Sequence, residues 1–135
     1  TLTTSSAASD VYKRQGPYGK NRSEILGIPK NGAALATIYC ALMISCCLNK
    51  LNTQGDVIMD GSFLKNPILC RLVAQLCGKK NLYISNDEAG TVKGAAQLTQ
   101  WSQLPILELE KCEPYNIEGL DLYVSSWFKA IGEIK

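Results

Sequence analysis

Residues 57–98 constrain the fold of this chain more than any other segment. The apolar run Val57-Ile58-Met59 ends at the turn Asp60-Gly61-Ser62, and Asn66-Pro67 then opens a helix. A second short strand, a loop and another helix follow, so strands alternate with helices. This alternation predicts an α/β fold with parallel strands. Ligands of such folds gather at the carboxyl ends of the strands, which is where Gly61 is expected.

The turn before the helix is typical of a binding site for a nucleotide or phosphate. Backbone N–H groups converge at a helix N-terminus, and the helix dipole favours negative charge there. Gly61 either supplies an unusual φ angle or, because it has no Cβ, lets the backbone approach a ligand. Asn66 caps the helix with its oxygen, while its NH₂ group can donate elsewhere. Asp60 is interpreted as a turn-forming acid and not as a catalytic base.

Two motifs in this segment resemble those of the FGGY carbohydrate kinases. The first is Asp60-Gly61-Ser62-Phe63-Leu64-Lys65-Asn66, and the second is Thr91-Val92-Lys93-Gly94-Ala95-Ala96. Their order and spacing together carry the resemblance, which covers residues 16–135 and corresponds to the last part of a full kinase. The family has a second glycine where this chain has Ser62. The Gly94-Ala95-Ala96 run predicts close helix packing against a neighbour.

The resemblance implies a fold, an activity and a set of ligands. The fold is a partial ribonuclease-H-like domain of the actin-type ATPase class, and the activity is ATP-dependent phosphorylation of a ketose or polyol hydroxyl. The implied cofactors are ATP and Mg²⁺, with Gly61, Ser62 and Asn66 as the nucleotide-binding residues. The catalytic base and most of the sugar or polyol pocket would lie N-terminal to this chain. We therefore expect no catalytic residue in it and no activity from it alone.

Two other functions remain open on the residues alone. One is a non-catalytic module that binds a nucleotide or small molecule on a Rossmann-like scaffold. The other is a structural pseudo-kinase segment, because the Cβ of Ser62 narrows the approach that a second glycine would leave open.

The first fifteen residues are expected to lie outside the folded domain. Residues 1–9 are small and polar with no apolar period, and Asp10-Val11-Tyr12-Lys13-Arg14-Gln15 resembles a translated sequencing adapter. Such a segment buries too little surface to offset its ordering entropy. We interpret residues 1–15 as an artefactual leader or a natural disordered one, and 16–135 as the kinase segment.

The charge and residue composition limit the classes of partner and of catalysis that this chain can support. The chain has 14 basic and 12 acidic residues, well mixed, which argues against a nucleic-acid-binding stripe or a polybasic membrane patch. It has no histidine, so Ser-His-Asp and Cys-His catalysis within the chain are excluded. Its six cysteines lack the close pairs of a zinc site and are expected to be free, buried thiols in a reducing cytoplasm. Formation of a homodimer is left open.

Residues 32–49 carry no charge and are mostly apolar. By length this segment is a borderline membrane span, but an all-round apolar helix can also be a central helix buried on several sides, which we expect here. Helices are predicted over 33–51, 67–77, 91–103 and 120–132. Strands are predicted over 24–26, 56–59 and 81–85, with 106–112 as a half-buried edge strand or surface tail.

Overall fold

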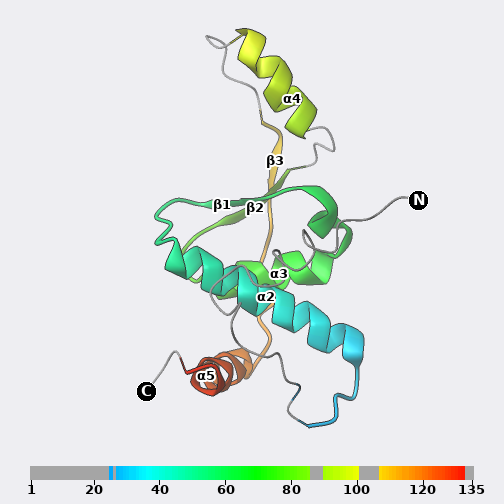
Figure 1. The fold of residues 1–135 in the computed structure, drawn as a ribbon, viewed down its shortest axis with the longest axis vertical. Helices are drawn as coiled ribbons and strands as arrows, with labels where there is room; N and C mark the ends of the chain where they lie inside the picture. The colour runs from blue at the N-terminus through cyan, green and yellow to red at the C-terminus, as the bar shows by residue number, and fades with distance from the viewer. Residues whose placement is uncertain (1–24, 26, 86–89, 101–106, 133–135) are drawn as a thin grey trace, which may run out of the picture. The chain divides into compact units, whose positions relative to one another are not determined.

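The computed structural model describes residues 25, 27–85, 90–100 and 107–132. The chain divides into the units Thr1–Gly32 and Ala33–Lys135. In the first unit the described residues before Gly32 form no regular helix or strand. The elements, labelled in Figure 1, are α2 (Gly32–Lys50), β1 (Val57–Met59), η1 (Gly61–Lys65), α3 (Pro67–Leu76), β2 (Leu82–Ser85), α4 (Gly90–Gln97), η2 (Leu98–Gln100), β3 (Leu109–Lys111) and α5 (Leu120–Ala130).

The three strands form one mixed sheet in the order β1-β2-β3. β1 and β2 are parallel, with Met59 opposite Ile84, and β3 pairs with β2 in the antiparallel direction, with Leu109 opposite Ser85. The predicted α/β class and the alternation of parallel strands with helices are therefore confirmed. β3 is an edge strand as predicted, but all three of its residues are exposed and not half-buried, because no described element covers them.

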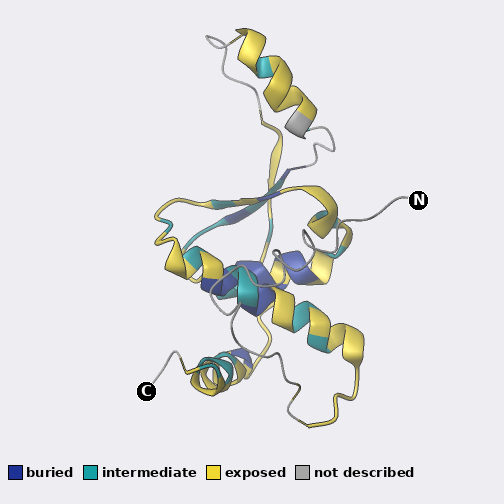
Figure 2. Ribbon diagram, viewed as in Figure 1, coloured by how far each residue is buried: buried dark blue, intermediate teal, exposed yellow. Residues whose placement is uncertain are grey.

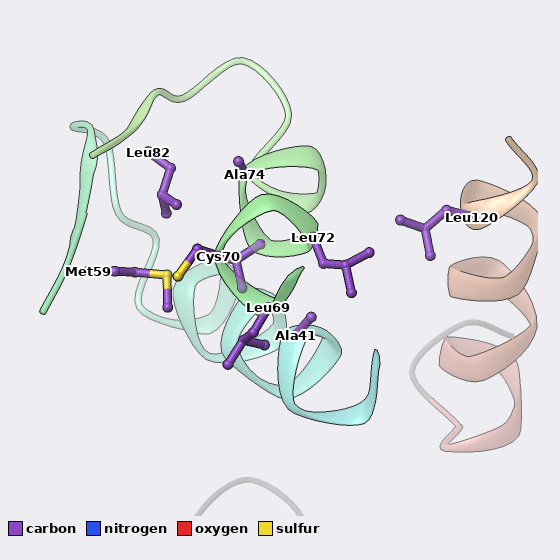
Figure 3. Close-up of a cluster of buried hydrophobic side chains, with 9 residues drawn as sticks. Ala41, Met59, Leu69, Cys70, Leu72, Ala74, Leu82 and Leu120 are labelled. Atoms are coloured by element: carbon purple, nitrogen blue, oxygen red, sulfur yellow. The ribbon is translucent and has the colours of Figure 1, made fainter. Parts of the chain in front are cut away.

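The core lies between the strands and the helices α2 and α3. Met59 and Leu82 point toward Cys70 and Ala74 of α3, and Ala41 of α2 joins the same cluster (Figure 3). Side chains alternate across a strand, so Ile58 lies on the opposite face from Met59 and is about half exposed. The buried residues in Figure 2 accordingly concentrate where α2, α3 and the strands meet.

α3 begins and ends where its sequence predicts. The Asn66 side-chain oxygen accepts a hydrogen bond from the Leu69 N–H at 3.1 Å, and Pro67 occupies the first turn, where its missing N–H costs nothing. Gly78, with φ +65°, follows the C-cap Cys77 and turns the chain out of the helix. Five of the helix's ten residues are buried, so α3 supplies much of the core.

The segment after β3 is held along α3. The side-chain amide of Gln75 exchanges two hydrogen bonds with the backbone of Ile117, at 2.9 and 3.0 Å. The Arg71 guanidinium lies 4.5 Å from the centre of the Tyr115 ring and donates to the Glu113 carbonyl. These contacts lead the chain to α5, where Leu120 is buried and Trp127 packs edge-on against Phe128.

Two sequence expectations about helix packing are wrong in the described residues. α2 is buried on one side only, at Ala41, Leu42, Ser45 and Cys46, and not on several sides. The Gly94-Ala95-Ala96 run is exposed, and nothing lies within 4 Å of a Cβ placed on Gly94, so no described neighbour packs against it. Burial depends on which elements meet in space, and hydropathy along one segment does not report that.

All six cysteines are free thiols, but they are not all buried. Cys46 and Cys70 are buried, whereas Cys40 and Cys47 are exposed on α2. Burial raises the pKa of the Cys70, Cys77 and Cys112 thiols above its ordinary value.

In the described part of the chain, α2 alone is long and apolar enough to cross a membrane by length and composition, a test that core helices of soluble proteins also pass. Of the predicted strand at 24–26 the structure describes Ile25, which is in no regular strand, and residues 101–103 of a predicted helix lie outside the described residues.

Candidate functional site

A cavity of about 590 Å³ lies at the carboxyl ends of the two parallel strands. Ile58 and Asp60 line it from the end of β1, and Ser85 from the end of β2. Because Ile58 points away from the core, the cavity is on the face of the sheet opposite α2 and α3. Further lining comes from α4, η2, the residues just before β3 and the first residue of β3, namely Gly90, Lys93, Gly94, Ala96, Gln97, Leu98, Thr99, Gln100, Leu107 and Leu109.

The lining combines apolar side chains with a few polar groups. Ile58, Leu98, Leu107 and Leu109 give it apolar walls, and Asp60 and Lys93 bring opposite charges to it. Cavities of this size and mixture are typical of small-molecule sites, where the apolar part supplies contact area and the polar groups fix orientation.

Asp60 connects the turn after β1 to the beginning of α4. One carboxylate oxygen accepts a hydrogen bond from the Gly61 N–H at 2.6 Å, which caps η1. The other oxygen lies 2.7 Å from the position that a Cβ on Gly90 would occupy. Real Cβ atoms essentially never come so close to another heavy atom, so with any other residue at position 90 either the Asp60 carboxylate or the start of α4 must shift. The prediction that Asp60 is a turn-forming acid is confirmed, and its contact with Gly90 is an additional role.

Gly61 and Ser62 lie directly beyond the strand, at the start of η1. Gly61 has φ +78°, a conformation that favours glycine, and the space where its Cβ would lie is open to 4 Å. Both residues are exposed. They belong to the same turn as Asp60, but the residues that line the cavity include Asp60 and not these two.

Asn66 lies at the start of α3, where both ends of its side-chain amide have partners. The oxygen caps the helix through Leu69, and the nitrogen donates to the Thr37 hydroxyl at 3.4 Å. The predicted capping role is therefore confirmed. Asn66 does not line the cavity, and its half-buried side chain connects α3 to α2.

At the amino ends of β1 and β2, the edge of the sheet opposite the cavity, the polar groups differ from those of the cavity. There the Asp56 carboxylate accepts from both the backbone and the side-chain N–H of Asn81, and Lys80 donates to the Thr53 hydroxyl at 2.7 Å. These polar groups are paired with one another across two loops. They stabilise the entry to the strands and line no part of the cavity described above.

Ser85, Gly90 and Ile58 were not identified as site residues from the sequence. Ser85 ends β2 just as Asp60 follows β1, so a polar residue at the carboxyl end of each parallel strand was an available signal. The approach of Gly90 to Asp60 had no local signal, because it joins residues thirty positions apart. Asp87 and Glu88, which precede α4 in the sequence, lie outside the described residues.

The described residues do not form a metal site of their own. Among residues 25, 27–85, 90–100 and 107–132, no group of three or more His, Cys, Asp or Glu side chains could hold an ion. Asp60 is the acidic residue in the cavity lining, and one of its oxygens is already bonded to the Gly61 N–H. A resident Mg²⁺ therefore does not fit these side chains.

Comparison with protein families gives a match over most of the chain. The family described as "Carbohydrate kinase FGGY, C-terminal domain" matches residues 4–106. This range begins inside the segment interpreted as a leader, and that interpretation remains a prediction. A comparison with curated proteins gives no match.

A solved structure agrees with the family match. The chain is similar to a carbohydrate kinase from Novosphingobium aromaticivorans, with a TM-score of 0.73 and 26% sequence identity over 86% of this chain. It spans 26% of the length of that kinase. The predicted resemblance and the fold expected from it, of the actin-like ATPase type, are thereby confirmed. The chain belongs to the FGGY carbohydrate kinase family and corresponds to its C-terminal domain.

Proposed function

We propose that this chain is the nucleotide-binding part of an ATP-dependent carbohydrate kinase that phosphorylates a hydroxyl of a ketose or polyol. The observation that carries the proposal is the cavity at the carboxyl ends of β1 and β2, in a chain of this family. Its volume and apolar walls suit a nucleoside, whose flat base needs contact area and whose ribose needs a few polar partners.

Gly61, Ser62 and Asn66 are proposed to contact the nucleotide beside this cavity. The open space over Gly61 allows the backbone to approach a ligand, which supports its part in the site. Ser62 is exposed, so its hydroxyl is available to donate to a phosphate. Asn66 keeps one amide hydrogen beyond the one given to Thr37.

Mg²⁺ is proposed to arrive with the phosphates of ATP and to need no metal site in this chain. Mg²⁺ commonly keeps several waters and takes few protein ligands when phosphates are present. The sugar or polyol would be bound mainly by parts of a kinase outside this chain. We place the protein in the cytoplasm, where ATP and free thiols coexist, and we propose no nucleic-acid or membrane partner.

The chain alone is expected to bind ATP weakly and to transfer no phosphoryl group. Phosphoryl transfer requires both reactants held in line and shielded from water, and we expect the base for a sugar hydroxyl to lie outside this chain. The test is calorimetric titration of the 135-residue chain with Mg·ATP, together with an ADP-release assay over pentuloses, hexuloses and polyols. Turnover by this chain would show that the active site has been assigned to the wrong part of the kinase.

The alternative is a module that binds a small molecule without catalysis. The mixed lining of the cavity is compatible with ligands other than ATP. Binding of adenosine and ATP in the titration is expected for the kinase and for a nucleotide-binding module alike, whereas no response to any adenine nucleotide favours a module for another small molecule.

A further inference from the structure

Thr37 of α2 is connected to Asn66 by a short chain of hydrogen bonds whose direction is fixed at both ends. The Thr37 hydroxyl donates to the Ala33 carbonyl at 2.9 Å, one helical turn earlier. A hydroxyl has a single hydrogen, so once it is donated the oxygen can only accept. In the contact with Asn66 the Thr37 oxygen is therefore the acceptor and the Asn66 side-chain N–H is the donor.

The other end of the Asn66 side chain imposes the same orientation. Its oxygen accepts from the Leu69 N–H at 3.1 Å, which only a carbonyl oxygen can do. Its nitrogen lies 3.4 Å from the Thr37 hydroxyl. A flipped amide would face N–H against N–H at Leu69 and lose both bonds, so the two contacts together select one orientation.

We infer that Thr37 is a positioning residue for Asn66: it takes one amide hydrogen and holds the second in a constant direction. This rests on the proposed function, in which that second hydrogen reaches the nucleotide. The helix cap by itself leaves the side chain free to rock about the Leu69 bond. The contact from α2 restricts that motion, and it couples a helix outside the cavity lining to the proposed nucleotide contact.

The key variant is Thr37→Val, which keeps the shape of the side chain and removes the hydroxyl. Threonine and valine have similar helix propensities, so α2 should be retained. Thr37→Ser restores the hydroxyl and serves as the rescue. Ser126→Ala is the matched control, because Ser126 makes the same kind of bond to the carbonyl four residues earlier, on α5.

The first readout needs no ligand. The two side-chain amide hydrogens of Asn66 are assigned by NMR through their loss in Asn66→Ser, a variant that keeps a capping oxygen. We expect Thr37→Val to shift this pair and speed its exchange with water severalfold, and Thr37→Ser and Ser126→Ala to leave it in place. An unchanged pair in Thr37→Val would overturn the inference.

The second readout is the affinity for Mg·ATP. We expect Thr37→Val to weaken binding about threefold to tenfold, corresponding to ~0.6–1.4 kcal/mol, and to have no further effect in the Asn66→Ser background. If Asn66→Ser weakens binding and Thr37→Val does not, the positioning role is wrong while the nucleotide site stands. If Asn66→Ser leaves ATP binding unchanged, the proposed contact of Asn66 with nucleotide is wrong, and the positioning role falls with it.

Discussion

The helices α3 and α4 occupy equivalent places in the chain but differ in burial. Each follows a parallel strand, α3 after β1 and α4 after β2. Half of α3 is buried against the strands and α2, whereas the described side chains of α4 are mostly exposed (Figure 2). α3 therefore completes the core of the domain. α4 contributes to the wall of the cavity and has an exposed apolar surface.

The difference in burial indicates that α3 mainly stabilises the fold, whereas α4 mainly forms the cavity. The cavity is lined by four residues of α4 besides Gly90, and by no residue of α3. A change in α3 should reduce stability first, and a change at the cavity should affect ligand binding first. Two exposed apolar residues, Val92 in α4 and Leu98 at the start of η2, should also favour association with other surfaces in solution.

The largest expected effect compares the same substitution in the two regions. Leu72→Ala in α3 should lower the free energy of unfolding by about 2–5 kcal/mol, because Leu72 is 2% exposed and its removal leaves a cavity. Leu98→Ala, in the η2 turn that continues α4, should cost less than ~0.5 kcal/mol, because Leu98 is 66% exposed. Urea denaturation measures both. Equal losses would remove the distinction between the two regions.

The approach of Asp60 to Gly90 should appear as an interaction between two substitutions. Gly90→Ala places a methyl group 2.7 Å from the Asp60 carboxylate, so either the carboxylate must leave its bond to the Gly61 N–H or the start of α4 must shift. We expect a loss of about 1–3 kcal/mol, most of which Asp60→Ala should relieve in the double variant. The control is Gly94→Ala, where the space is open. Additive losses of unfolding free energy from Gly90→Ala and Asp60→Ala would contradict a close approach of Asp60 to Gly90.

Gly61→Val should weaken ATP binding more than backbone strain explains. Valine is strained at φ +78° and also fills the open space beside the proposed nucleotide. Gly78→Val is the matched control, since its φ is +65° and it precedes β2 at the opposite edge of the sheet. We expect both variants to lose stability and only Gly61→Val to lose affinity, by about tenfold or ~1.4 kcal/mol. Equal affinity would leave Gly61 as a turn residue only.

The cysteines should report the burial of α3 with a smaller effect. Cys40 and Cys47 are exposed, so they should react with a thiol reagent in the native chain long before Cys46 and Cys70, and all six should react in denaturant. Mass spectrometry of the alkylated peptides gives the order. Rapid native labelling of Cys70 would contradict the packing of α3.

The smallest effect is a pH dependence from the same thiols. Burial raises the pKa of Cys70, Cys77 and Cys112 in the folded state above 9.0. The unfolded chain then binds fewer protons above that pH, so the contribution of these thiols to stability is constant below about pH 9 and falls as pH rises further. Cys70→Ser should reduce this slope, measured as thermal midpoints between pH 8 and 10. An increase in stability over that range would have the wrong sign.

Features that depend on neighbours in sequence were predicted well. Asn66, Pro67 and Gly78 specify the ends of α3 through capping and backbone geometry, which act within a few residues. The burial of α2 and the exposure of Gly94-Ala95-Ala96 depend on partners distant in the sequence, and these predictions were wrong. The turn at Asp60-Gly61 was identified from sequence, but the cavity around it combines side chains from five elements and their adjoining residues.

The most direct test of the nucleotide site is an NMR titration of the 135-residue chain with Mg·ATP. We expect backbone signals to shift at residues 60–66 and 90–94, around the carboxyl ends of β1 and β2. Signals of Thr53, Asp56 and Asn81, at the opposite edge of the sheet, should stay in place. Shifts concentrated at that opposite edge, or none at either edge with ATP at millimolar concentration, would contradict the assignment of this domain as the nucleotide-binding part of the kinase.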